Sequence, residues 1–322
     1  MRLSKKKTYI WIGGAAIVAI AGFLLSKIGD NNINIANEGN ISSIAGINCQ
    51  NSNARPFAVM LSSDPEARPL SGVGEADIVF EMPVTPNQVT RMMAIFQCNQ
   101  PKELGSIRSS RLDFLPLALG LNPIYAHFGG EHTVLERLND GVIDNIDGLK
   151  YDGTVYYRKS SIPRPHNSFT DFDSLKKISD KLGYQTTGAT ISYLHEKNDK
   201  SLGVINPPVI YKGNFEVEWA YDQETNSYSR TRAGEEETDK NTGEQVRTKN
   251  VVFMETSWSP IDKDYIRIKT IGTGDISVYK NGQMVEGTWS KAGEKEKLFF
   301  YDAQEKEMIF APGSIWVEII TD

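Results

Sequence analysis

The sequence of 322 residues has little of what usually identifies an enzyme: it contains two cysteines, four histidines and none of the common catalytic motifs. No stretch matches the G-x-S-x-G of serine hydrolases, the H-E-x-x-H of zinc proteases or the G-x-x-x-x-G-K-[ST] of P-loop proteins. The glycines in residues 71–77 are spaced wrongly for a dinucleotide-binding loop. The sequence therefore leaves open which cofactor, if any, the protein uses and whether the protein is an enzyme.

A basic stripe is also absent. The net charge is −6, because residues 1–200 carry 21 basic and 20 acidic side chains and residues 201–322 carry 14 and 21. Proteins that bind nucleic acid need a surplus of positive charge that meets the phosphates. We therefore expect no nucleic acid partner, least of all for the acidic second part of the chain.

Only one long hydrophobic run is present, and it lies near the N-terminus. Arg2 and Lys5–Lys7 precede it, and no charged residue lies between Lys7 and Lys27. At about 1.5 Å per residue, a helix over this run nearly spans a hydrocarbon layer of roughly 30 Å. The alternative is a cleaved signal peptide, because Ala19-Ile20-Ala21 resembles a cleavage site.

The positive charges before the run set its orientation, because basic flanks stay in the cytoplasm. The sequence thus predicts a cytoplasmic tail over 1–8, a transmembrane helix over 9–28 and a linker over 29–48 that is rich in Asn, Gly and Ser. The predicted location is the cell membrane, in a single pass, with the bulk of the chain outside.

The two cysteines, Cys49 and Cys98, both fall in the part predicted to lie outside the membrane. An oxidising compartment permits a disulfide between them, so the pair is a disulfide candidate. Two separate buried thiols are the alternative.

Hydrophobic patterning divides the rest of the chain in two. Apolar runs at 55–61, 75–82, 90–98 and 122–128 alternate with helical patterns at 112–121, 132–141 and 170–184, which predicts an α/β ligand-binding domain over 49–200. Residues 201–322 hold short aromatic and β-branched runs, with the hairpin signal Asn281-Gly282, and predict a mostly β domain. The expected fold class is α+β: an N-terminal α/β domain followed by a mostly β C-terminal domain.

Local signals place the helix ends. Ser110 with Asp113 three residues later resembles a capping box before the first helix. Thr170 and Gly183 are the expected N-terminal and C-terminal caps of the last one.

Two arginines lie at the predicted start of the first helix, in the stretch "ELGSIRSSRLDF" over 103–114. Cations are unfavourable at the positive end of a helix, whereas an anion there would be stabilised. Arg108, Ser109 and Arg111 therefore predict a phosphate, pyrophosphate or carboxylate site. The alternative is local pairing of Arg111 with Asp113 and of Arg108 with Glu103.

A second motif, "IYAHFGGEH" over 124–132, places His127 beside a flexible Gly129-Gly130 turn. His127 is a candidate general acid or base. No zinc pattern fits the spacing of the histidines, and a core histidine bonded to the backbone is the alternative.

A third motif, "SIPRPHNSF" over 161–169, presents polar side chains on a loop stiffened by two prolines. Arg164 and Asn167 are candidate ligand-binding residues and His166 is a candidate catalytic one, while a solvated connector is the alternative. Arg91, on a predicted strand, joins the ligand-binding set; a plain salt bridge with Glu81 is the alternative for it.

The order of these motifs resembles the YerB-like lipoprotein family of Gram-positive bacteria, a domain family of unknown function with a matching C-terminal module. The resemblance rests on "RPFAVML", "ARPLSGVGEADIVFEMPV", "TRMMAIFQ", "LGSIRSSR", "YAHFGG", "PRPHN" and "PGSIWVEI" and covers about residues 55–320. It implies a location in the cell envelope and no established reaction. Many members carry a lipid-modified Cys after the signal, which this sequence lacks, so the helix itself would be the membrane anchor.

A weaker similarity concerns LytR-Cps2A-Psr wall-polymer ligases, in which arginines and an Asp-bound metal hold a lipid pyrophosphate. Carried over by position, it implies Asp77 as a metal ligand and Arg108 and Arg111 as phosphate ligands. The ligase pattern has an Asp directly after its first arginine, whereas Ser109 follows Arg108 here.

Together these observations predict an extracytoplasmic protein that binds an anionic, phosphate-bearing wall or lipid-linked ligand. The alternative is a non-catalytic module that docks cell-wall synthesis proteins.

Overall fold

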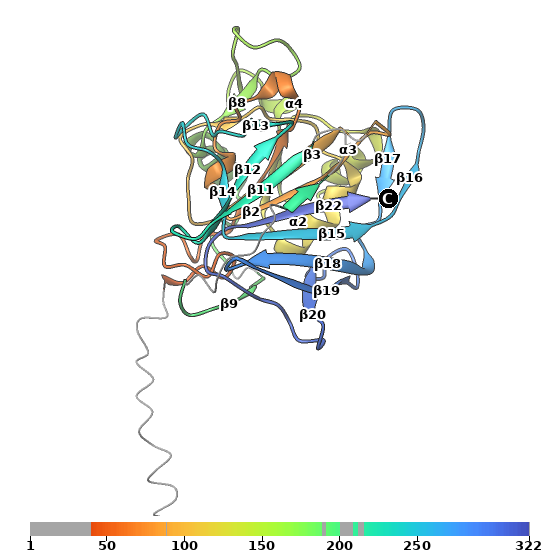
Figure 1. The fold of residues 1–322 in the computed structure, drawn as a ribbon. Coiled ribbons are helices and arrows are strands. Elements are labelled where there is room, and N and C mark those ends of the chain that lie inside the picture. The colour runs from red at the N-terminus through yellow and green to blue at the C-terminus, as the bar shows by residue number, and fades with distance from the viewer. Residues whose placement is uncertain (1–39, 88, 189–190, 200–208, 212–215, 322) are drawn as a thin grey trace, which may run out of the picture. The chain divides into compact units, whose positions relative to one another are not determined.

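The structure is a computed structural model that describes residues 40–87, 89–188, 191–199, 209–211 and 216–321 (Figure 1). The predicted cytoplasmic tail and transmembrane helix lie outside these residues, as does most of the predicted linker. Within the described ranges, no helix is long and apolar enough to cross a membrane.

One ten-stranded sheet organises the described residues from Asn40 onward, which form a single compact unit. Its strands lie in the order β20-β19-β18-β15-β22-β2-β3-β1-β5-β6. Their bounds are β1 (Phe57–Ser62), β2 (Ile78–Pro83), β3 (Thr90–Phe96), β5 (Ile124–His127), β6 (Asn145–Asp147), β15 (Asn250–Thr256), β18 (Gly272–Lys280), β19 (Gln283–Lys291), β20 (Phe299–Asp302) and β22 (Ile315–Thr321).

The last strand joins the two halves of the sequence. β22 lies between β2 and β15 and is parallel to both, with Ile315 opposite Ile78 on one side and Asn250 on the other. The two predicted domains therefore share one sheet. The structure agrees with the predicted content of each, which is mixed α and β in the first and mostly β in the second.

Smaller elements cover this sheet. The helices are α2 (Leu115–Leu121), α3 (His132–Asn139), α4 (Gly148–Tyr151) and α5 (Phe172–Leu182), with short 3-10 turns at η2 (Pro65–Ala67), η3 (Val73–Glu75) and η4 (Leu112–Phe114). A five-stranded sheet contains β10 (Val209–Tyr211), β11 (Val217–Asp222), β12 (Ser227–Arg232), β13 (Glu235–Glu236) and β14 (Arg247–Thr248). The remaining strands pair as β4 (Leu104–Gly105), β8 (Ser168–Thr170) and β7 (Tyr157–Arg158), as β16 (Trp258–Pro260) and β17 (Ile266–Ile268), and as β9 (Leu194–His195) and β21 (Ile309–Phe310).

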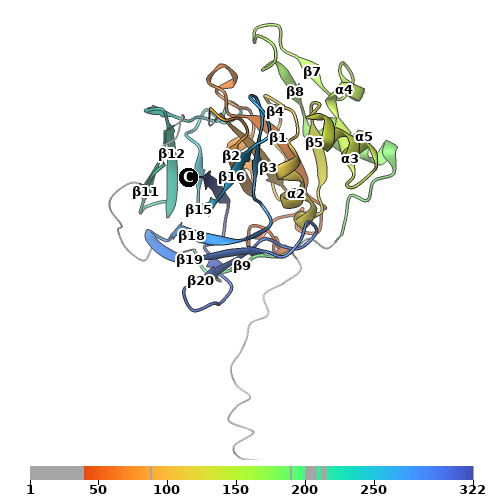
Figure 2. The same cartoon turned by 90° about the vertical axis from the view of Figure 1, so that its right-hand side faces the viewer.

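Strand alternation divides the core into two layers, because successive side chains of a strand point to opposite faces. On one face Met60, Phe80 and Met93 pack with residues of α2 and α3. On the other face Val59 and Val79 pack with Trp219 of β11 and with α5. Figure 2 shows the β11–β12 sheet on one side of the central strands and α2 on the other.

Several local predictions are confirmed. α3 covers the predicted 132–141 segment, Gly183 ends α5 in the left-handed conformation, and Asn281-Gly282 is the two-residue turn between β18 and β19. Both turn residues have positive φ, as a type I′ turn requires.

The predicted capping box is wrong. α2 begins at Leu115 after a 3-10 turn, and no side chain caps it. The carboxylate of Asp113 instead accepts hydrogen bonds from the Ile268 amide and from Arg267, each 2.9 Å away, because the β16–β17 hairpin packs over this turn. In α5 the N-terminal cap is Asp171, one residue after the expected Thr170.

The folded body begins before Cys49. Ile44 and Ala45 are buried in the core, and the buried Ser42 donates a hydrogen bond to Gln97, 2.7 Å away. The described end of the predicted linker, from residue 40, therefore packs against the sheet.

Candidate anion-binding site

The three sequence motifs meet through their backbones. The Arg108 amide donates to the Met60 oxygen, 2.9 Å away, and the Arg108 oxygen accepts from the Phe128 amide at 3.0 Å. The Ile107 amide donates to the Ser168 oxygen at 2.7 Å. The segment around Arg108 thus runs between the end of β1, the residues after β5 and the start of β8.

This position is the edge of the sheet where parallel strands end. β1 pairs parallel with β5, and β5 pairs parallel with β6, so their carboxyl ends lie together. Ligand sites of α/β sheets commonly lie just beyond this edge. The site therefore forms at a sheet edge rather than at the start of a helix, where the sequence placed it.

Arg91 lies at the start of β3 and is 4% exposed. Its Nη1 donates to the main-chain oxygen of Ser109 at 2.9 Å, and its Nε has no partner. Burial and the positive charges of Arg111 and Arg108 hold the pKa of Arg91 well below its usual value, although Asp64 opposes them. Arg91 forms no ion pair with any residue that the structure describes.

Arg108 has one carboxylate in reach. Its Nη2 lies 3.9 Å from Oδ2 of Asp64, beyond hydrogen-bond distance, and its Nε is buried without a partner. Burial lowers the pKa of Arg108; Asp64 opposes this effect and Arg111 adds to it. The alternative pairing with Glu103 does not occur, because that carboxylate binds Lys159 and the hydroxyls of Ser71 and Tyr157.

Arg111 completes the cluster. Its Nη1 donates to the Ser110 oxygen at 3.2 Å, its guanidinium lies 5.0 Å from the centre of the Tyr265 ring, and its Nε is buried without a partner. Asp113, its alternative partner, is bound to Arg267 instead. Arg111 also lines a cavity of about 320 Å³, together with Lys263, Asp264, Tyr265 and four residues before β3, which are Thr85, Pro86, Asn87 and Val89.

Hydroxyl and imidazole groups surround these arginines. Ser62 Oγ donates to Asp64 at 2.7 Å and lies 3.5 Å from Nδ1 of His166, which is 3.8 Å from the same carboxylate. The hydroxyls of Ser110 and the buried Tyr125 are 2.8 Å apart. Burial, followed by the charge of Arg108, lowers the pKa of His166.

We name Arg91, Arg108 and Arg111 the arginine cluster. Burial is the largest cause that lowers the pKa of each of them. Within the described part of the chain, a single carboxylate lies within 4.0 Å of any of the three. A buried surplus of positive charge with unsatisfied N–H donors is unfavourable unless an anion meets it.

His127 makes a separate set of contacts in the core of the protein. It is fully buried, its Nδ1 donates to the Gly129 oxygen at 2.8 Å, and its Nε2 lies 3.3 Å from Asn145. Burial lowers its pKa, while Asp147 opposes the shift. These contacts match the alternative of a core histidine, which fixes the turn at Gly129.

One of the three candidate residues on the proline-stiffened loop lies beside the arginine cluster. His166 faces Asp64, as described above. Arg164 is exposed at the loop, and Asn167 is buried with its Oδ1 accepting from Arg158 at 2.9 Å. The side chain of Asn167 is therefore occupied away from the arginine cluster, and Ser109 contributes its carbonyl oxygen to Arg91.

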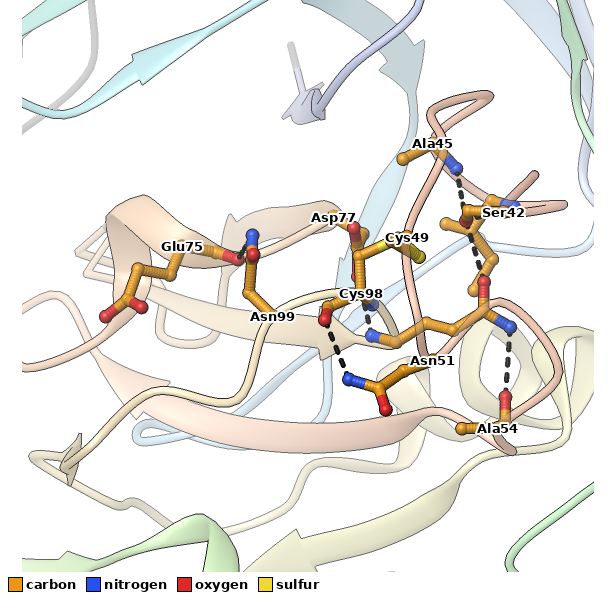
Figure 3. The surroundings of a disulfide bond; sticks show 11 residues. Ser42, Ala45, Cys49, Asn51, Ala54, Glu75, Asp77, Cys98 and Asn99 are labelled. Atoms are coloured by element: carbon orange, nitrogen blue, oxygen red, sulfur yellow. Dashed lines mark hydrogen bonds between the residues drawn. A yellow bond between two sulfur atoms is a disulfide. The ribbon is translucent and has the colours of Figure 1, made fainter. Parts of the chain in front are cut away.

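Asp77, the candidate metal ligand, is hydrogen-bonded to the backbone. Its carboxylate accepts from the backbone amides of Gln97 at 2.5 Å and Cys98 at 2.9 Å, so it fastens the end of β3 (Figure 3). Among the described residues there is no group of three or more His, Cys, Asp or Glu that could hold a metal ion. Cys98 is bonded to Cys49, as the disulfide candidate predicted.

The sequence missed a buried ion network on the opposite face of the sheet. Arg230 binds Glu81 at 2.7 Å, Glu237 at 2.8 Å and Glu318 at 3.1 Å, and Arg232 also binds Glu81. The alternative pairing of Glu81 with Arg91 does not occur, because the β2–β3 register places Met82, not Glu81, opposite Arg91. With this register, alternation along the two strands puts the two charges on opposite faces of the sheet.

Comparison with known proteins agrees with the motifs. The model of the N-terminal domain of a protein of unknown function (DUF3048) matches residues 44–185, and the model of its C-terminal domain matches residues 208–317. The "Putative lipoprotein YerB" of Bacillus subtilis (strain 168) is 32% identical over 274 residues, which cover 83% of this chain and 82% of that protein. The crystal structure of the YerB protein from Bacillus subtilis superimposes with a TM-score of 0.77 at 29% identity and covers 87% of this chain and 96% of that one. The chain therefore belongs to the DUF3048 family and is similar to YerB along both of its domains.

Proposed function

We propose that this protein binds a phosphate- or pyrophosphate-bearing ligand of the cell envelope through Arg91, Arg108 and Arg111. The observation that carries the proposal is that all three Nε atoms are buried without a partner, while the nearest carboxylate, that of Asp64, lies 3.9 Å from Nη2 of Arg108. Phosphate oxygens match guanidinium donors in charge and geometry. Burial, together with repulsion between the arginines, lowers their pKa values, and a bound anion would oppose this effect.

The cavity beside Arg111 is the proposed entrance. Lys263, Asp264 and Tyr265 line this opening beside Arg111. A ligand with an apolar tail could leave that tail outside while its phosphate reaches the guanidinium. This geometry favours a lipid-linked phosphate over a buried small anion.

The proposed location is the outer side of the cell membrane. The hydrophobic run at 9–28 would hold the chain there, and the Cys49–Cys98 bond fits an oxidising compartment. The printed name of the Bacillus subtilis relative contains the word lipoprotein, which agrees with an envelope location. Protease added to intact cells should digest the chain beyond Lys27; full protection would contradict this topology.

Thermal unfolding of the full chain in detergent tests ligand binding. Sodium pyrophosphate and farnesyl pyrophosphate are compared with farnesol, with and without a divalent metal, by intrinsic fluorescence. We expect both pyrophosphates to raise the midpoint and Arg108→Ala to weaken the response at least about tenfold, since a charge-assisted contact is lost.

Arg247→Ala is the matched control, because Arg247 is an exposed arginine in the β11–β12 sheet that pairs with Asp222. It should respond like the wild-type protein. Equal responses of wild type and Arg108→Ala to every anion would refute the proposal. A response to farnesol alone would point to the lipid tail instead of the phosphate.

His166 is the proposed proton carrier if the ligand is turned over. Its Nδ1 is close to Ser62 and Asp64, and its neighbour Arg108 would hold the phosphate. His166→Asn should then retain binding of pyrophosphate and lose its hydrolysis, measured as phosphate release. If the variant and the wild-type protein release phosphate at the same rate, His166 has no catalytic role.

The alternative function is docking of cell-wall synthesis proteins. One observation favours it: Leu194 and Ile309 lie opposite each other in the β9–β21 pair and are both largely exposed. Replacing both residues by Ser should abolish capture of a wall-synthesis protein from solubilised membranes while pyrophosphate binding persists.

A further inference from the structure

A second cavity, of about 540 Å³, is separate from the arginine cluster. Its lining comes from four segments: residues 100–103, Tyr157, the start of α5 at 171–173, and Lys240 with Asn241. The first three segments belong to the α/β part and the last belongs to the β part. None of Arg91, Arg108 and Arg111 lines it.

Part of the lining is held in place by hydrogen bonds. Glu103 accepts from Ser71 at 2.7 Å, from Tyr157 at 2.6 Å and from Lys159 at 2.5 Å. Asn241 donates to the main-chain oxygen of Glu103 at 2.9 Å. These bonds fix polar groups before a ligand arrives, which reduces the entropy lost on binding.

Other polar side chains around the cavity have spare hydrogen-bonding capacity. Gln100, Lys102, Asp173 and Lys240 are exposed, and none of them bonds to another side chain in the described ranges. Two lysines, Lys102 and Lys240, and three carboxylates line the cavity, and one of these carboxylates, that of Glu103, is already paired with Lys159 outside the lining. The cavity therefore offers both donors and acceptors but no net charge that would select an ion.

An aromatic surface completes the cavity. Tyr157 is 38% exposed, and its ring stacks on Phe169 with centroids 6.3 Å apart and planes 28° apart. The bond to Glu103 fixes its hydroxyl. A partly exposed aromatic ring in a fixed orientation can pack against the C–H groups of a ligand. The hydrogen-bonding side chains beside it can bind the hydroxyl groups of the same ligand.

We infer that this cavity binds an uncharged saccharide chain. The ring of one sugar unit would lie against Tyr157, and its hydroxyls would bond to Asp173, Lys240 and Gln100. The volume of about 540 Å³ lies within the range of small-molecule sites. This site is independent of the proposed anion site, because the two share no residue.

Saturation-transfer NMR on the full chain in detergent tests this inference, with chitotetraose and maltotetraose as probes and tetra-alanine as the peptide comparison. We expect at least one saccharide to bind. Asp173→Asn combined with Lys240→Ala should weaken it at least about tenfold, because a charged acceptor is replaced by a neutral amide and an ammonium donor is lost.

The matched control is Asp180→Asn combined with Lys181→Ala, which makes the same charge change at the exposed far end of α5. It should bind like the wild-type protein, as should Arg108→Ala. Three results would overturn the inference: no saccharide signal, equal weakening in the control, or tetra-alanine binding with the same dependence on Asp173 and Lys240.

Discussion

Arg91 donates from Nη1 to the main-chain oxygen of Ser109, 2.9 Å away, and this is the one hydrogen bond that its guanidinium makes to the residues the structure describes. The bond ties β3 to the segment that carries Arg108 and Arg111. It also leaves most of a buried cation unsatisfied, because a guanidinium has five N–H donors. Arg91 therefore makes opposite contributions to stability and to anion binding.

Arg91→Met should raise the free energy of unfolding by about 1 kcal/mol in phosphate-free buffer, because a buried cation without a counterion is removed at the loss of one hydrogen bond. Urea unfolding followed by fluorescence measures this. The same variant should lose its stabilisation by pyrophosphate, whereas Arg247→Met should change neither property. A less stable variant that still responds to pyrophosphate would contradict the role of Arg91.

Anion binding should strengthen as the pH falls from about 8 to 6. Burial and Arg108 hold the pKa of His166 below its usual value of about 6.5, and a neighbouring anion favours the protonated form. Binding therefore takes up a proton, so it is favoured at low pH. Titration of pyrophosphate at several pH values measures the slope, and His166→Asn should flatten it. An unchanged slope would place the titrating group elsewhere.

Asp77 should make stability depend on pH. Burial raises its pKa to about 6, against the opposing hydrogen bonds from the Gln97 and Cys98 amides. The folded state thus binds the proton of Asp77 more tightly than the unfolded state does. The protonated side chain therefore adds to the free energy of unfolding fully below about pH 4, and this addition is lost as the pH rises to about 6. Asp77→Asn should remove this slope from urea unfolding curves, and Asp180→Asn should retain it. A wild-type curve flat across this range would refute the assignment.

The disulfide should contribute about 4 kcal/mol to the free energy of unfolding, because it closes a loop of 49 residues in the unfolded chain. Replacing Cys49 and Cys98 together by Ser should lower the urea midpoint accordingly. Adding a reductant to the wild-type protein should have a similar effect and no effect on the variant. Equal midpoints for variant and oxidised wild type would show that the bond contributes nothing.

The buried ion network should be sensitive to the loss of one partner. Arg230→Met leaves Glu81, Glu237 and Glu318 without their shared cation, which should lower the free energy of unfolding by about 3–5 kcal/mol. Arg247→Met removes an exposed pair and should change it by less than about 0.5 kcal/mol. Similar effects of both variants in urea unfolding would mean that the network is not a structural centre.

Predictions that depend on sequence neighbours agree with the structure. The hydrophobic period predicts α3, and the left-handed conformation that glycine adopts easily predicts the cap at Gly183. The preference of Asn-Gly for tight turns predicts the turn at residues 281–282. Each of these signals acts within a few residues. The capping box predicted at Ser110 does not form, because the Asp113 carboxylate instead accepts a hydrogen bond from the amide of Ile268, 155 residues away in the sequence. The partner of Glu81 is likewise set by distant contacts: the strand register separates it from Arg91, and Arg230 of β12 binds it.

The amino-acid sequence was sufficient to identify the family, the order of helical and strand segments, and the short stretches near strand ends that carry arginines. Which of those charges meet depends on how distant segments pack. Backbone bonds from residues 107 and 108 to Ser168 and Met60 bring Arg108 beside Asp64 and His166, whereas His127 and Asp77 are bonded to the backbone elsewhere. The physical reason is that helix and turn signals are local, whereas the partner of a buried charge is set by contacts between distant segments.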